Sequence, residues 1–277
     1  MFMDNERIEE LKSIAAEVRK DILRMVGLAR SGPFETSISA AELLVYLYWE
    51  ELLLVPSEPR RADRDRFIIN IPAAVPALYA VLARRGFFER EHLWHYRRLG
   101  AMLQALPDFK RTPGIDAPCL TVQPAAAMAA ALAEELFAGE GSPRVVFLTA
   151  GVSFMSEEFV KEMRRIGGCR VPNLMAVIAS RGAGAGGRAA TDEKNMALLA
   201  AGGWEVRAAV SEDFRSLEEA CNSFGFSGGG PKALFVSTAG KLGLSVSDAG
   251  LSETVHSLSM GELDQALEEL EVKSNEH

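Results

Sequence analysis

The first half of the chain has hydrophobic residues at the spacing of amphipathic helices. Between residues 8 and 26, apolar side chains recur every three or four positions, which predicts a long helix with one buried stripe. A capping box formed by Ser39 and Glu42 predicts the start of a deeply buried second helix. The same criteria predict a short strand at residues 67–69 and helices at residues 39–54, 76–85, 90–99 and 125–137.

The second half alternates short apolar runs with helical segments. The apolar runs cover residues 144–149, 173–179, 204–210 and 232–238, and the helical segments cover residues 157–166, 192–201 and 213–223. This alternation predicts an α/β fold in which a parallel sheet is flanked by helices. Such sheets bind ligands beyond the carboxyl ends of their strands, so the loops of interest follow Leu148, Ile178, Val210 and Thr238.

The chain is predicted to form one domain over residues 1–277, because no linker or internal repeat divides it. Ser259 and Glu262 predict a capped helix near the C-terminus. A polar tail is expected to follow from about residue 274.

Composition and charge narrow the class of protein. The 30 Lys and Arg residues against 38 Asp and Glu residues give a formal net charge of −8, which argues against nucleic acid as the main partner. No uninterrupted apolar run reaches the length of about 18 residues that a membrane span needs. The three cysteines, Cys119, Cys169 and Cys221, form no CxxC pair or disulfide framework. We therefore expect a soluble protein of the reducing cytoplasm.

The few histidines limit the acid–base chemistry that the chain can perform. Of the four, His92 and His95 are three residues apart on one predicted helix, but no third ligand of the right kind lies nearby in a strongly charged segment. His256 and His277 stand in polar contexts without a motif, and no GxSxG elbow is present. The motifs therefore predict no catalytic residue and no metal site.

A glycine-rich segment at residues 180–188 follows the second run of the predicted sheet. It does not match a dinucleotide-binding loop, because the third glycine of a G-x-G-x-x-G motif falls in the wrong place. With Arg181 and Arg188 near its ends, the segment could fold around an anion through its backbone N–H groups. The alternative is a surface loop without a ligand.

Several stretches resemble the N-terminal half of transketolases in order and nearly in spacing. They extend over about residues 7–240 and include residues 14–25, 39–44, 63–68, 77–80, 112–117 and 203–206. The resemblance implies the thiamine diphosphate-binding fold of the diphosphate-domain type. It also implies a site shared with a pyrimidine-binding subunit, a divalent cation held by an Asp and an Asn, and transfer of a two-carbon ketol unit between sugar phosphates.

The chain departs from this family at the motif positions. The family's H-P-G-G is replaced by residues 33–36, the histidine of S-K-G-H by Ala73, and D-G-H-D by residues 210–213. The metal motif G-D-G-E becomes Thr149, Ala150, Gly151 and Val152, and the Asn of D-x-N becomes Arg181. The Gly-rich loop of the family is shortened to residues 118–124, which contain no glycine. Magnesium needs hard oxygen ligands, and a guanidinium repels a cation.

The leading expectation from these departures is a subunit without bound thiamine diphosphate or metal and without catalytic residues. It would act as a structural or regulatory partner of a transketolase C-terminal-half subunit, or of an intact paralogue. A homodimer is also expected, because the Ala-rich residues 125–132 permit close approach of helices.

Two alternatives remain open. In the first, the chain is an active subunit for ketol transfer, in which Arg181 and Arg188 bind a diphosphate or carboxylate and a helix N-terminus near Gly151 assists. In the second, the chain senses a metabolite without turnover.

Overall fold

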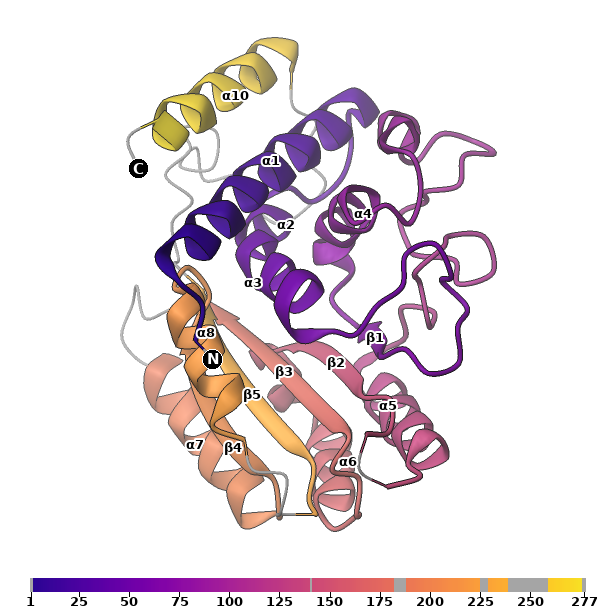
Figure 1. Ribbon diagram of the computed structural model, residues 1–277, viewed down its shortest axis with the longest axis vertical. Helices are drawn as coiled ribbons and strands as arrows, with labels where there is room; N and C mark the ends of the chain where they lie inside the picture. Colours follow the sequence, from indigo (N-terminus) through magenta and orange to yellow (C-terminus); the bar gives the residue numbers. More distant parts are fainter. Residues whose placement is uncertain (1, 140, 182–187, 225–228, 239–258, 276–277) are drawn as a thin grey trace.

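A five-stranded parallel sheet lies at the centre of the computed structural model, which describes residues 2–139, 141–181, 188–224, 229–238 and 259–275 (Figure 1). All strand pairings are parallel, so the carboxyl ends of the strands meet at one edge, which we call the carboxyl edge. The predicted α/β fold is confirmed. Across the sheet, the strands are β1 (Arg66–Ile69), β2 (Val145–Ala150), β3 (Leu174–Arg181), β5 (Lys232–Thr238) and β4 (Glu205–Val210).

Helices pack against both faces of the sheet. Successive strand residues alternate between two hydrophobic clusters: Val146 and Leu148 belong to one, and Val145 and Phe147 to the other. Burial on both faces explains why the strands read as nearly continuous apolar runs in the sequence. The first cluster contains residues of α1 (Asn5–Ala29), α3 (Ala41–Tyr46), α4 (Val75–Arg84) and α8 (Phe214–Asn222), and the second those of α5 (Val122–Leu136), α6 (Glu157–Gly167) and α7 (Arg188–Ala201).

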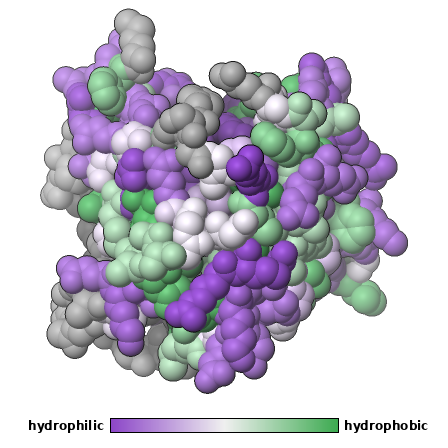
Figure 2. Space-filling view, turned by 90° about the horizontal axis from the view of Figure 1, so that it is seen from below, coloured by the Kyte–Doolittle hydropathy of each residue, from purple (hydrophilic) through white to green (hydrophobic). Residues whose placement is uncertain are grey.

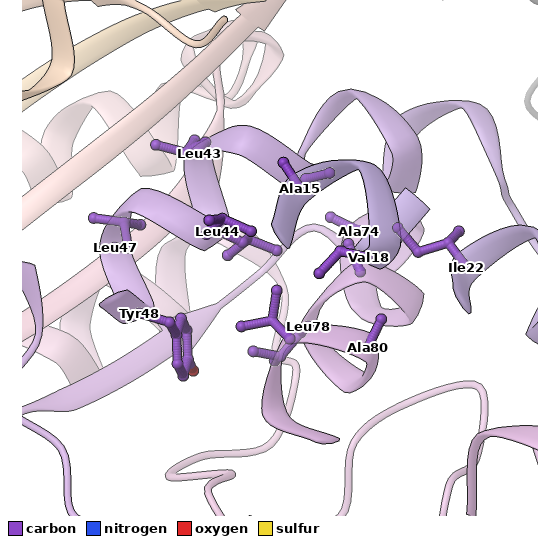
Figure 3. Packing of buried hydrophobic residues seen from close by; sticks show 14 of the residues in the cluster. Ala15, Val18, Ile22, Leu43, Leu44, Leu47, Tyr48, Ala74, Leu78 and Ala80 are labelled. Carbon is purple, nitrogen blue, oxygen red and sulfur yellow. The ribbon is translucent and has the colours of Figure 1, made fainter. Parts of the chain in front are cut away.

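The N-terminal helices form a compact layer around α1. Figure 3 shows Val18 of α1 among side chains of the neighbouring helices, including Leu44 of α3 and Leu78 of α4. Helix α10 (Met260–Asn275) lies along α1 (Figure 1), and a Cβ added at Gly27 would come within 2.6 Å of Leu263 Cδ2. The close approach of α10 to α1 therefore depends on a glycine.

The predicted helix at residues 39–54 is wrong in detail. The chain there forms α2 (Glu35–Ser39), α3 and a π-helical turn, η1 (Leu47–Glu51). The Ser39–Glu42 capping box does not form, because the Ser39 hydroxyl donates to the Glu35 carbonyl and Glu42 pairs with Arg19. The predicted helix at residues 90–99 is the 3-10 helix η3 (Arg90–His95).

The capping box near the C-terminus is confirmed. The Glu262 carboxylate accepts a hydrogen bond from the Ser259 backbone N–H at 2.8 Å, and the Ser259 hydroxyl accepts one from the Glu262 N–H at 3.3 Å. Helix α10 continues to Asn275, one residue past the predicted start of the polar tail.

The alanines of α5 pack inside the domain. Those that line its inner face are fully or almost fully buried in the second hydrophobic cluster, with Ile68 of β1 and Phe147 of β2. The small side chains therefore bring α5 close to its own sheet. They give no support to the homodimer predicted from them. These alanines are Ala125, Ala126, Ala129, Ala130 and Ala133.

Replacing Gly203 by alanine should lower the free energy of unfolding by about 2 kcal/mol. Gly203 has φ +96°, and an added Cβ would lie 2.5 Å from the Gly167 carbonyl oxygen. Urea unfolding would measure the loss. Gly86→Ala is the control, because Gly86 also has positive φ (+84°) but nothing lies within 4 Å of an added Cβ. Equal losses in the two variants would contradict the steric part of this prediction.

No helix in the described part of the chain is long and apolar enough to cross a membrane. The face shown in Figure 2 carries several groups of hydrophobic residues separated by hydrophilic ones.

Candidate functional site

The carboxyl edge carries the positions of the family's metal motif and, just beyond β1, Ala73. Ala150 ends β2 and pairs with Ala179 of β3, and Gly151 opens the 3-10 helix η4 (Gly151–Met155). Arg181 is the last residue of β3 and pairs with Thr238 of β5. Ala73 lies in the 3-10 helix η2 (Pro72–Ala74), soon after β1, and Val152 of η4 is 67% exposed.

The two arginines proposed to bind an anion lie beside this edge in the backbone. Arg181 ends β3 and Arg188 begins α7, but their side chains and residues 182–187 lie outside the described part of the structure. An anion contact by Arg181 or Arg188 therefore stays a prediction.

A carboxylate that the sequence patterns did not reveal lies over Gly151. Asp192 comes from α7, and its Oδ2 accepts a hydrogen bond of 2.7 Å from the Ser180 hydroxyl at the end of β3. A Cβ added at Gly151 would lie 3.6 Å from Asp192 Oδ1 and 3.3 Å from Ser180 Cβ. The absence of a side chain at Gly151 therefore lets Ser180 and Asp192 approach the end of β2 closely, with one carboxylate oxygen toward Gly151.

A second polar group lies at the end of β1. Asn70 is 7% exposed, and neither atom of its side-chain amide has a hydrogen-bond partner in the described structure. Its backbone N–H donates to the Leu148 carbonyl at 3.1 Å, so the ladder between β1 and β2 continues through this residue. Alternation along the strand then places the Asn70 side chain on the face that carries Ile68, which is the face packed against α5.

Two buried hydroxyl groups lie at the end of β2, the strand between these two positions. Thr149 is fully buried at the end of β2, and its hydroxyl lies 2.9 Å from that of Ser153, which is 6% exposed. The β1–β2 register pairs Ile69 with Leu148, so Asn70 lies level with Thr149. Polar side chains therefore stand at or just beyond the carboxyl ends of all three strands: Asn70 at β1, Thr149 at β2 and Ser180 at β3.

The N-terminus of α5 points toward the same edge. The Asn173 side chain, just before β3, donates to the Ala133 carbonyl near the end of α5 at 2.9 Å, so α5 runs antiparallel to the strands. Its N-cap residue Thr121 makes no side-chain capping bond. The uncapped N–H groups and the positive end of the helix dipole favour an anion there.

The donor set of this edge fits a diphosphate and a divalent cation. Carboxylate and hydroxyl oxygens, present at Asp192 and Ser180, are the ligands that Mg²⁺ prefers. The Asn70 amide and the first turn of α5 supply donors suited to phosphate oxygens. Gly151, at the end of the strand between them, adds no side chain of its own.

No histidine of the described structure lies among these groups. His92 and His95 are on η3, which packs against α1 and α4, and the His95 ring nitrogen Nδ1 lies 3.1 Å from the Glu91 carbonyl oxygen. Within the described residues, no group of three or more His, Cys, Asp or Glu side chains could hold a metal ion on its own. His256 and His277 lie outside the described residues.

The fold is an open parallel α/β domain, a class that binds its ligands at the carboxyl ends of the strands. The chain belongs to the family described as "Transketolase, thiamine diphosphate binding domain", whose model matches residues 11–271.

Curated relatives and solved structures agree with this family. The chain is 36% identical over 112 residues to "6-deoxy-6-sulfo-D-fructose transketolase subunit SqwG" of Clostridium sp. (strain MSTE9), covering 40% of this chain and 41% of that protein. It is 27% identical to the transketolase of Rattus norvegicus over 85% of this chain and 38% of that protein. The alignments thus span about two fifths of either relative. The transketolase of Campylobacter jejuni has the same fold, with a TM-score of 0.76, 19% identity, and coverage of 97% of this chain and 43% of that chain.

The expectation that this chain lacks a cofactor is wrong. It rested on the loss of an Asp at Ala150 and an Asn at Arg181, but the family to which the chain belongs is a thiamine diphosphate-binding domain. The physical reason is that side chains from elements outside the family's motif positions can reach the same edge. Oxygen and nitrogen donors reach the same edge from Asp192 and Asn70.

Proposed function

We propose that the chain is the diphosphate-binding subunit of a transketolase-type enzyme and that a separate chain supplies the pyrimidine-binding half. The family match over residues 11–271 carries this proposal, together with the polar carboxyl edge. Two relatives support the division into subunits, because the names of both describe transketolase subunits. One is the SqwG protein, and the other is the apulose-4-phosphate transketolase subunit of Phocaeicola vulgatus, which is 29% identical over 110 residues.

The carboxyl edge would hold the diphosphate end of thiamine diphosphate. When bound, this cofactor supplies carbanion stabilisation for breaking a carbon–carbon bond. The first turn of α5 and the polar strand ends would orient the phosphate groups, and Asp192 with Ser180 would hold the cation. Val152 and Met155, which are 67% and 84% exposed on η4, form an apolar rim that a partner chain would cover and thereby shield from water.

A second candidate is a subunit that supports a partner structurally or regulates it without ketol transfer of its own. The observation that favours it is the residue type at the family's histidine positions, which are Pro33, Ala73 and Glu212 in this chain. The Ala73 position cannot transfer a proton, and its carbonyl is bound to the Ser37 hydroxyl at 2.7 Å. Pro33 has no group that can transfer a proton either, whereas the carboxylate of Glu212 is the one such group at these three positions.

We also propose that the protein acts in the cytoplasm. The support is that all three cysteines, Cys119, Cys169 and Cys221, are free, as expected in a reducing compartment. Burial raises the pKa of the Cys221 thiol to about 12, so this thiol stays protonated at neutral pH.

Copurification tests the proposed function. The tagged full chain, isolated under mild conditions, is expected to bring down a chain homologous to the C-terminal half of transketolases, identified by mass spectrometry. The reconstituted pair should transfer a two-carbon unit from a ketose phosphate to an aldose acceptor only when both chains, thiamine diphosphate and Mg²⁺ are present. A stable pair without transfer would favour the second candidate. Full activity of this chain alone would contradict both.

A further inference from the structure

We propose that this chain holds a divalent cation and its phosphate ligand with Asp192 and Asn70, on either side of Gly151, in place of an Asp and Asn at the ends of β2 and β3. The inference rests on the proposed function, because it concerns the same carboxyl edge. The ligand it predicts is a Mg²⁺–diphosphate unit.

Asp192 has the position that a cation ligand requires. Its Oδ2 is fixed by the Ser180 hydroxyl at 2.7 Å, and its Oδ1 faces the space that a side chain at position 151 would fill. Gly151 directly follows Ala150, where the aligned carboxylate is absent. A Mg²⁺ ion bound with a phosphate compound commonly needs only one or two protein carboxylates, because phosphate oxygens and water complete its shell. One carboxylate from α7 therefore suffices.

Asn70 is the independent observation that points to a ligand. Its side chain is more than nine-tenths buried, and both amide atoms lack a partner in the described structure. Leaving a buried donor and acceptor unpaired is costly, and such groups are rare unless something outside the chain completes them. The position of Asn70 at the end of β1 places this amide at the edge to which the N-terminus of α5 also points.

The strand order sets the separation of the two groups. Asn70 follows β1, and Gly151 follows β2. Ser180 lies near the end of β3, where its hydroxyl donates to Asp192 of α7. Two strand spacings amount to roughly 10 Å, a width that a cation with its diphosphate can span. The two ends of this edge suit the two parts of the ligand. Near β3 a carboxylate is available to the cation. Near β1 an amide N–H and the N-terminus of α5 are available to phosphate oxygens.

Titration of the full chain with Mn²⁺ and inorganic pyrophosphate tests this site without a partner or a sugar. Electron paramagnetic resonance would report bound Mn²⁺. Asp192→Asn should weaken binding at least tenfold, since loss of even an outer-shell partner typically costs about 10–100-fold. Glu193→Gln, which changes the exposed neighbour on the same helix, should leave binding unchanged.

Asn70→Leu distinguishes a ligand-binding role from a structural one. It should weaken Mn²⁺–pyrophosphate binding, because the amide donor is lost. It should also raise Tm by about 2–4 °C, because an unpaired buried amide is replaced by an apolar group of similar size. A structural Asn70 would instead lower Tm on replacement and leave binding unchanged.

Three results would overturn the inference: no Mn²⁺–pyrophosphate binding by the wild-type chain, wild-type affinity in Asp192→Asn, or wild-type affinity in Asn70→Leu. A failure to find a partner chain or ketol transfer would count against the proposed function but would not change these titrations. The two hypotheses therefore fail separately.

Discussion

Replacing Asp21 by alanine should lower the free energy of unfolding by about 3 kcal/mol, because two arginines lose the buried carboxylate that they share. Asp21 lies on α1 and is fully buried. Its carboxylate accepts hydrogen bonds of 2.7 Å from both Arg84, at the end of α4, and Arg90, at the start of η3. The hydrogen bond to Asp21 also raises the pKa of Arg90. Since α1, α4 and η3 meet at this carboxylate, its loss should loosen the whole N-terminal layer.

Thermal and urea unfolding would measure this effect, with an expected fall in Tm of about 6–12 °C. Glu17→Gln is the matched control on the same helix. The Glu17 carboxylate accepts a 3.0 Å hydrogen bond from the same Arg84, but its side chain is 41% exposed. Exposed ion pairs contribute about 1 kcal/mol or less. Comparable losses in the two variants would show that the burial of Asp21 does not determine how much it contributes to the free energy of unfolding.

The sheet could be predicted because its strands are buried on both faces. The runs around Phe147 and Val177 contain few polar residues, and helical segments separate them in the chain, so the pattern predicts a parallel sheet. The helix at residues 39–54 could not be predicted correctly, since Glu42 is drawn into an ion pair with Arg19 of α1. That contact depends on tertiary packing, which a local capping pattern does not contain.

The site could be predicted only in part for a related reason. Sequence reasoning led to the ends of β2 and β3, where Ala150 and Arg181 replace the family's ligands. It missed Asp192, because a charged residue near the start of an amphipathic helix is most simply explained as a solvated side chain. It missed Asn70, because only the register of β1 and the burial of its side chain reveal an amide without a partner. A comparison with the family's motif positions alone cannot reveal side chains that reach the same edge from different helices and strands.

Gly151→Leu should weaken the binding of Mn²⁺–pyrophosphate by roughly 10–100-fold, or about 1.4–2.8 kcal/mol, because the added side chain would cover Asp192 Oδ1. A smaller loss is expected in Gly151→Ala, whose Cβ would lie 3.3 Å from Ser180 Cβ and 3.6 Å from Asp192 Oδ1. The fold should tolerate both changes, since Gly151 does not have a positive φ and the next residue, Val152, is 67% exposed. Calorimetric titration and Tm measurements would separate binding from stability.

Gly168→Ala is the control for this series. It follows α6, has φ −79°, and an added Cβ there would meet nothing closer than the Arg165 carbonyl oxygen at 3.5 Å. It should therefore leave both binding and Tm unchanged. Unaltered binding in Gly151→Leu would show that the diphosphate does not lie over this glycine. A graded loss from alanine to leucine would instead tie the binding site to the carboxylate of Asp192, which faces the same space.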